Sequence, residues 1–147
     1  MSATLPTVGG RASLPPLAGL LRVAEVRARA AAALEPEAET DPPVLVNIVD
    51  AVEPPALMLE WVDPWLEPQT AGTGYWLARL DVVCLAQRHE PGPGVESLEA
   101  LITHTITRLR ADSYPWPAAT LQAPRVFTIA GVPLLGARVS YRLPVTI

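Results

Sequence analysis

Residues 75–87, with the sequence YWLARLDVVCLAQ, alternate between two sets of side chains with a period of two. The first set is apolar and consists of Trp76, Ala78, Leu80, Val82, Cys84 and Ala86. The second set mixes apolar side chains with the charged Arg79 and Asp81. Because successive side chains of a strand point to opposite faces of a sheet, this stretch predicts a long strand with one buried and one mixed face.

Segments on both sides of this strand complete a small α+β domain. Apolar and β-branched runs predict further strands at residues 44–50, 56–62, 125–130 and 137–147, the last two joined by residues 131–136. Apolar stripes at helical spacing predict amphipathic helices over residues 17–34, with Ser13 before it as an N-cap, and over residues 95–110. This order favours a mostly antiparallel sheet of about five strands, covered on one face by two amphipathic helices.

The length of the chain is sufficient for one domain spanning residues 1–147, half of them hydrophobic. Within it we expect a loose N-terminus at residues 1–13 and an acidic, proline-rich linker at residues 35–43. Residues 63–74 combine two prolines with two glycines and predict a long loop. Loops of this length tend to be functional, so we expect it to order on docking to a partner.

Composition excludes several classes of protein. The formal net charge of −4 disfavours electrostatic binding of duplex DNA, which depends on cations that release phosphate counterions. No apolar run reaches the roughly 18 residues that a membrane span needs, so we expect no membrane association. The single Cys84 forms no internal disulfide, and residues 1–10 lack the pattern of a signal peptide, which together indicate synthesis in a reducing cytoplasm.

The sequence shows no convincing combination of a nucleophile with a base, of metal ligands, or of phosphate-binding glycines. Cys84 lies in the middle of a strand, where a thiol is normally inert, and His104 lies on a helix away from carboxylates in sequence. His89 precedes a turn, and the glycines of residues 72–74 lead into a strand, whereas a phosphate cradle opens a helix. We therefore expect no catalytic residues, no metal ligands and no cofactor.

Aromatic residues gather around the predicted long loop. Four of the chain's eight aromatic side chains lie in or beside it: Trp61, Trp65, Tyr75 and Trp76. Trp and Tyr are common anchors of protein interfaces. Trp61 and Trp76 are expected to pack inside the domain, since both lie in strands. The candidate partner-docking residues are Trp65, Leu66, Glu67 and Tyr75.

Charged residues on the polar strand faces form a second candidate surface. Arg79, Asp81, Arg138 and Arg142 are the candidate subunit interface, in which arginine forks would pair with carboxylates of a neighbour. A solvated face of the sheet is the alternative interpretation of the same four residues.

The second half of the chain resembles a known family in four stretches. They are RHEPGPGVE (88–96), RLRADSYPWP (108–117), PRVFTIAGVP (124–133) and ARVSYRLPV (137–145). With the order of elements, these residues resemble the tail terminator proteins of long-tailed, siphovirus-type phages that infect actinobacteria. The resemblance covers residues 80–147, and the N-terminal half is compatible with it.

This resemblance implies a structural virion protein with no catalytic motif. Proteins of that family form a hexameric ring on the tail tube, stop its polymerisation and present a surface to head-completion proteins. The implied partners are further copies of the chain, the tail-tube protein and the head-completion or stopper protein. Genomic DNA would pass through the pore without specific binding. The implied location is the head–tail neck of the virion, after synthesis in the host cytoplasm.

Three alternatives stay open at this point. The first is another neck component, such as a head-completion or stopper protein. The second is a small ligand-binding or enzymatic domain whose pocket involves Asp81, His89 and Glu90. The third is a cytoplasmic dimer without a virion role.

Overall fold

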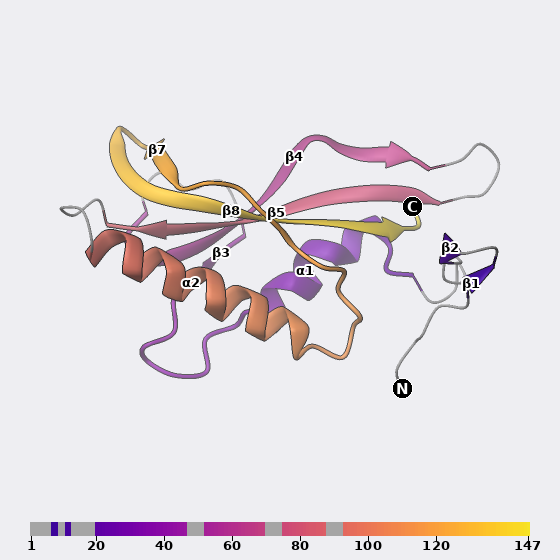
Figure 1. Cartoon of the computed structure of the whole chain (residues 1–147), viewed down its shortest axis with the longest axis horizontal. Helices are drawn as coiled ribbons and strands as arrows, with labels where there is room; N and C mark the ends of the chain where they lie inside the picture. Colours follow the sequence, from indigo (N-terminus) through magenta and orange to yellow (C-terminus); the bar gives the residue numbers. More distant parts are fainter. Residues whose placement is uncertain (1–6, 9–10, 13–19, 47–51, 70–74, 88–92) are drawn as a thin grey trace.

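A six-stranded sheet with two helices on one face forms the described part of this computed structural model (Figure 1). The structure describes residues 7–8, 11–12, 20–46, 52–69, 75–87 and 93–147. In these residues the elements are β1 (Thr7–Val8), β2 (Arg11–Ala12), α1 (Val23–Ala33), β3 (Val44–Leu45), β4 (Ala56–Pro68), β5 (Trp76–Ala86), α2 (Pro93–Arg110), β6 (Thr120–Leu121), β7 (Arg125–Ile129) and β8 (Val132–Val145).

The strands of the main sheet follow the order β3-β4-β5-β8-β6, and β7 also pairs with β8. The β3–β4 pair is parallel, and the other pairs of this sheet are antiparallel. β1 and β2 form a separate two-stranded sheet. The α+β prediction is confirmed, with a mixed sheet of six strands rather than about five.

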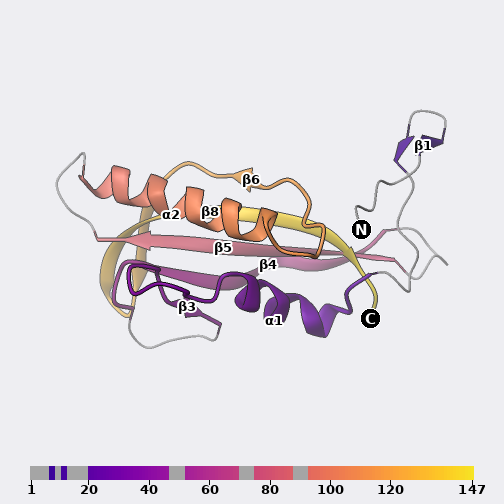
Figure 2. The ribbon, with the colours of Figure 1, turned by 90° about the horizontal axis from the view of Figure 1, so that it is seen from below.

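β5 is the central strand, and its two faces differ as the sequence predicts. One face contributes Ala78, Leu80, Val82 and Cys84 to the main core, where each is fully buried. Both helices pack on this face, and Figure 2 shows α1 and α2 side by side against it. No helix of the described residues covers the other face, which carries a smaller cluster at one end beneath the β7–β8 hairpin.

β4 is longer than predicted, which corrects the expected loop at residues 63–74. The strand continues to Pro68, with an irregularity between Trp61 and Leu66. Beyond this bulge the pairing with β5 resumes and reaches Pro68 opposite Trp76. The prolines are tolerated because β4 is an edge strand over this stretch, where a missing N–H breaks no ladder. Residues 70–74 lie outside the described part.

α1 begins at Val23, later than the sequence predicts. The backbone around Arg22 instead forms an isolated bridge with Thr146, just after β8: Val23 N donates to Thr146 O at 2.7 Å, and Thr146 N donates to Leu21 O at 3.0 Å. The Glu25 carboxylate accepts the N–H of Arg22 at 3.0 Å and caps the helix at this point. The predicted start at residues 17–19 and the N-cap Ser13 lie outside the described residues.

β3 and β8 also differ in length from the predictions. β3 ends at Leu45, whereas the sequence predicts a strand over residues 44–50. Residue 46 has no regular secondary structure, and residues 47–50 lie outside the described part. β8 begins at Val132, because Ala130 and Gly131 adopt positive φ angles of 52° and 80° and form a two-residue hairpin with β7. The connection predicted at residues 131–136 therefore belongs mostly to β8. α2 matches its prediction closely.

Gly136 supports this hairpin by leaving space for Phe127. A Cβ atom at Gly136 would lie 2.5 Å from Cδ1 of Phe127 and 3.1 Å from the carbonyl oxygen of Cys84. We expect Gly136→Ala to lower the free energy of unfolding by about 1–3 kcal/mol, because the ring must be displaced from its packing. Denaturant unfolding measures this loss. Adding Phe127→Leu to Gly136→Ala should cost less than the sum of the two single variants, and strict additivity would contradict the steric explanation.

Candidate functional site

The four residues of the predicted subunit interface all lie on the face of the sheet without helices. Arg79 and Asp81 belong to β5, and Arg138 and Arg142 belong to β8. Cross-strand pairing places Arg79 directly opposite Arg142, and residues two apart on a strand share a face. The structure therefore brings the four together on one surface, which we call the open face.

Two of these residues form an ion pair within the subunit. Arg138 donates to Asp81 Oδ2 at 3.0 Å and to Glu60 Oε1 at 3.3 Å. The side chain of Asp81 is 1% exposed and that of Arg138 is 14% exposed. The guanidinium of Arg138 also lies 5.3 Å from the centre of the Phe127 ring. Glu60 and Phe127 were not predicted as partners of Arg138, because both come from strands whose pairing no local sequence pattern shows.

Arg79 and Arg142 are the remaining two, and they face each other as like charges. Arg142 is exposed and Arg79 is partly buried. Within the part of the chain that the structure describes, neither side chain makes an ion pair or hydrogen bond. Like charges directly opposite on neighbouring strands are destabilising. The two guanidinium groups can therefore donate hydrogen bonds to an anion from outside the subunit.

The predicted docking residues are divided between β4 and the start of β5. Trp65, Leu66 and Glu67 belong to β4, whereas Tyr75 comes just before β5. Trp65 is 39% exposed, and its ring lies against Trp61 with the centroids 4.8 Å apart. Leu66 packs against the main core. Trp65 is thus the exposed aromatic residue that the sequence analysis expected, but on an edge strand rather than in a loop.

A groove of about 380 Å³ lies next to Trp65, between α1 and β4. Its lining residues are Val23, Ala24, Arg27, Ala28, Val46, Trp61 and Trp65. The Nε atom of Arg27 is buried there without a hydrogen-bond partner among the described residues. Two indole rings and a buried guanidinium nitrogen suit a segment that supplies an apolar side chain and an acceptor. Arg27 was not among the predicted site residues, because its place beside Trp61 and Trp65 depends on how α1 packs on β4.

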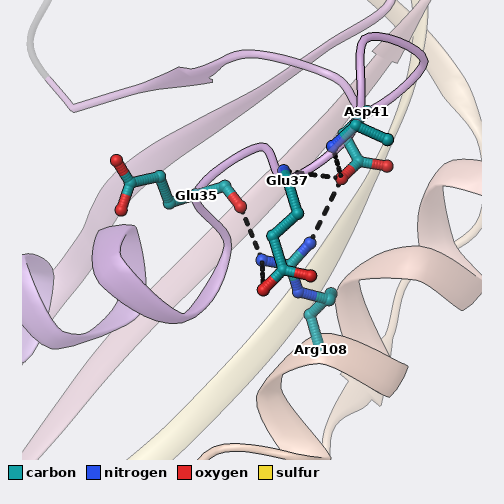
Figure 3. A network of polar contacts seen from close by, with 5 residues as sticks. Glu35, Glu37, Asp41 and Arg108 are labelled. Atoms are coloured by element: carbon teal, nitrogen blue, oxygen red, sulfur yellow. Dashed lines mark hydrogen bonds and ion pairs between the residues drawn. The ribbon is translucent and has the colours of Figure 1, made fainter.

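The chain beyond α1 is held in a turn by Arg108 of α2 (Figure 3). The Asp41 carboxylate accepts the backbone N–H groups of Glu37 at 2.9 Å and Ala38 at 3.1 Å. Arg108 donates to Asp41 Oδ2 at 3.4 Å and to the carbonyl oxygen of Glu35. The hydrogen bonds from Glu37 and Ala38 and the nearby cation of Arg108 lower the pKa of Asp41. The carboxylate is therefore ionised at neutral pH and fixes the turn.

Residues 35–41, which we call the acidic turn, keep three other carboxylates at the surface. Glu35, Glu37 and Glu39 are exposed, and the Glu37 side chain is 80% exposed even though it lies 3.5 Å from Arg108. Figure 3 shows the carboxylate of Glu35 pointing away from Arg108. The segment predicted as a linker is thus an ordered, negatively charged projection beside the helices.

A second cluster of polar contacts ties α1 to the chain after α2. Arg29 Nε donates to Asp112 Oδ2 at 3.0 Å, and the indole N–H of Trp116 donates to the same oxygen at 2.8 Å. Burial would raise the pKa of Asp112, but these hydrogen bonds outweigh it and lower the pKa below its usual range. Together with Arg108, this contact holds the helical layer in place.

The groups considered for catalysis are not assembled into a site in the described residues. Asp81 is occupied by Arg138, and His89 and Glu90, its partners in the enzymatic alternative, lie outside the described part. No group of three or more His, Cys, Asp or Glu residues in the described ranges is placed to hold a metal ion. Across the same ranges, no helix is long and apolar enough to span a membrane.

Cys84 is expected to be unreactive in the native protein. It is fully buried, and this burial raises the pKa of its thiol to about 11, even though the contact with Thr105 acts in the opposite direction. Between the ordinary thiol pKa and 11, the native protein keeps the neutral thiol, so little thiolate forms at pH 8–9. Alkylation by iodoacetamide at pH 8.5 should be at least about 100-fold slower in buffer than in denaturant. Similar rates in both would show that the thiol is accessible.

In comparisons with known proteins, no family model matches this chain. No curated protein is significantly similar to it either.

Proposed function

We propose that this chain is a structural virion protein that forms a homohexameric ring, caps the phage tail tube, ends its polymerisation and joins it to the head-completion complex. The observation that carries the proposal is that the subunit presents two unlike surfaces of opposite charge. These are the open face with Arg79 and Arg142, and the acidic turn. Contacts between unlike patches are heterologous, and they close into rings when the rotation between subunits is suitable.

The groove beside Trp65 is the surface that we assign to the tail-tube protein. Trp65 is exposed at the free edge of β4, and aromatic residues at such positions are frequent interface anchors. Arg27, which lines the groove, would add a polar contact there. Glu67 is opposite Leu77 and therefore lies on the open face, away from the groove. A tube contact on the edge of the sheet leaves the open face and the acidic turn for contacts between copies.

The charge of the chain agrees with a passage for DNA. With a formal net charge of −4, a ring of these subunits would not retain duplex DNA through phosphate contacts. Genomic DNA would pass the pore without specific binding. The ring would occupy the head–tail neck of the virion, after synthesis of the chain in the host cytoplasm.

Electron microscopy of tails assembled with and without this protein tests the proposal. We expect tubes of uncontrolled length in its absence and tubes of uniform, capped length in its presence. Tails of normal length that lack heads would instead indicate a head-completion or stopper protein. Trp65→Ala should reduce capping, whereas the matched control Leu121→Ala, at an exposed position of β6, should cap normally.

A further inference from the structure

The opposed arginines on the open face are an energetic anomaly within the isolated subunit. Arg79 and Arg142 are direct cross-strand partners of β5 and β8, so their Cβ atoms are about 4.5–5.5 Å apart. Their repulsion destabilises the pairing of β5 with β8. An anion placed between the two guanidinium groups would turn this repulsion into attraction.

Among the residues that the structure describes, no carboxylate neutralises this pair. Asp81 lies two positions along β5 but is committed to Arg138, which also contacts Glu60. The ion pairs in the described residues include neither Arg79 nor Arg142. The anion must therefore come from outside the subunit.

The acidic turn has the chemistry that such a pair recognises. Guanidinium groups bind carboxylates through parallel hydrogen bonds, and two adjacent groups can hold one or two carboxylates. The turn offers the exposed carboxylates of Glu37 and Glu39. Its backbone is already held by Asp41 and Arg108, so little conformational entropy is lost on binding.

A subunit cannot place its own acidic turn on its own arginine pair. The turn follows α1 and lies beside the helical layer, whereas Arg79 and Arg142 lie on the opposite face of the sheet (Figures 1 and 2). The contact therefore needs a second copy, and the two copies use different patches. Repeated contacts of this kind produce a head-to-tail assembly.

We propose that the acidic turn of one copy binds the Arg79–Arg142 pair of the next, and that this contact builds the ring. The proposal rests on the proposed function for the closed, hexameric form, and it adds the residues of the contact. A phosphate group is the other anion that would suit two arginines. The carboxylates of Asp81 and Glu60 on the same face make the surroundings unfavourable for a polyanion, and they favour a small protein carboxylate.

A charge-swap experiment with full-length protein tests this contact. The face variant carries Arg79→Glu and Arg142→Glu, and the turn variant carries Glu37→Arg and Glu39→Arg. Each variant alone opposes like charges at the contact, which should weaken self-association by at least about 100-fold in sedimentation or mass photometry. In an equimolar mixture, the native acidic turn of the face variant can bind the native arginine pair of the turn variant. The arginines on the turn of the turn variant can in turn bind the glutamates on the face variant. We expect the mixture to regain the wild-type mass, with the two variants alternating around the assembly.

A matched control separates this contact from a general effect of net charge. Arg110→Glu with Arg125→Glu changes the net charge as much as the face variant does, at two exposed positions away from the pair. This control should assemble as the wild type does. Far-ultraviolet circular dichroism and melting of each variant verify that it is folded before its mass is interpreted.

Several outcomes would overturn the inference. A wild type that stays monomeric at all concentrations would do so, as would a folded face variant that assembles normally. If the wild type binds duplex DNA and the face variant does not, while the assembled mass of both is the same, the arginine pair binds phosphate instead. If rings form through this contact but tubes are not capped, the proposed function fails and this inference stands. If rings of the face variant still cap tubes, the proposed function stands and the contact between the acidic turn and the arginine pair is wrong.

Discussion

Replacing Arg138 by methionine is expected to lower the free energy of unfolding by about 3–5 kcal/mol, because it leaves the carboxylate of Asp81 buried without a counter-charge. Asp81 is 1% exposed, and Arg138 Nη1 is 3.0 Å from its Oδ2 atom. Glu60, at 39% exposure, retains water as a partner and suffers less. Equilibrium denaturation by urea, with the midpoint and slope fitted separately, measures the loss.

A second variant distinguishes the loss of a partner from the loss of packing. In the double variant Asp81→Val with Arg138→Met, Glu60 is the only partner left, and water can solvate its partly exposed carboxylate. Replacement of a whole buried ion pair is often neutral. We therefore expect the double variant to recover most of the stability lost by Arg138→Met. If the double variant is as unstable as the sum of the two single variants, the ion pair is not the cause.

Truncating Leu80 to alanine should cost about 2–5 kcal/mol of unfolding free energy. Leu80 is fully buried at the centre of β5, where the main core meets both helices. The loss combines the transfer of the removed methyl groups with the cavity that the helices and the sheet do not close. Thermal and urea unfolding of the variant test this value.

Leu121→Ala is the matched control for this truncation. The same atoms are removed, but the side chain of Leu121 is already 52% exposed on β6. Its effect should stay within about 0.5 kcal/mol. A comparable loss at both positions would contradict the assignment of the main core to the helix-covered face of β5.

Much of the fold was predictable because its strongest signals are local. The alternation in residues 75–87 predicted β5 and its two unlike faces, and the apolar stripe in residues 95–110 predicted α2. These patterns depend only on the period of the backbone conformation, so a short window contains all the necessary information. The helix-covered side of the sheet follows from the same two patterns.

The boundaries of β4 and α1 were predicted wrongly because they depend on distant partners. The prolines of residues 63–68 are typical of a loop, yet pairing with β5 keeps this stretch in the sheet. The helix formers before Val23 are typical of a helix, yet the bridge to Thr146 keeps Arg22 extended. In both places, hydrogen bonds to a remote strand outweigh a weak local preference.

For the candidate surfaces too, local patterns predicted part of the arrangement and distant contacts decided the rest. Sequence alone placed Arg79, Asp81, Arg138 and Arg142 on polar strand faces, since alternation assigns a face to each residue. It did not separate the buried Asp81–Arg138 pair from the two unpaired arginines. Which of these arginines has a carboxylate partner depends on which strands are neighbours and on the register between them.

By itself, the sequence determined that this is an α+β domain with a long central strand, an amphipathic second helix and an excess of acidic residues, because period and composition are properties of short segments. Only the tertiary structure decided that Arg79 faces Arg142, that Arg108 fixes the acidic turn, and that these two surfaces lie on opposite sides of the sheet. The physical reason is that ion pairing acts over a few ångströms in space, between residues that the chain separates by tens of positions.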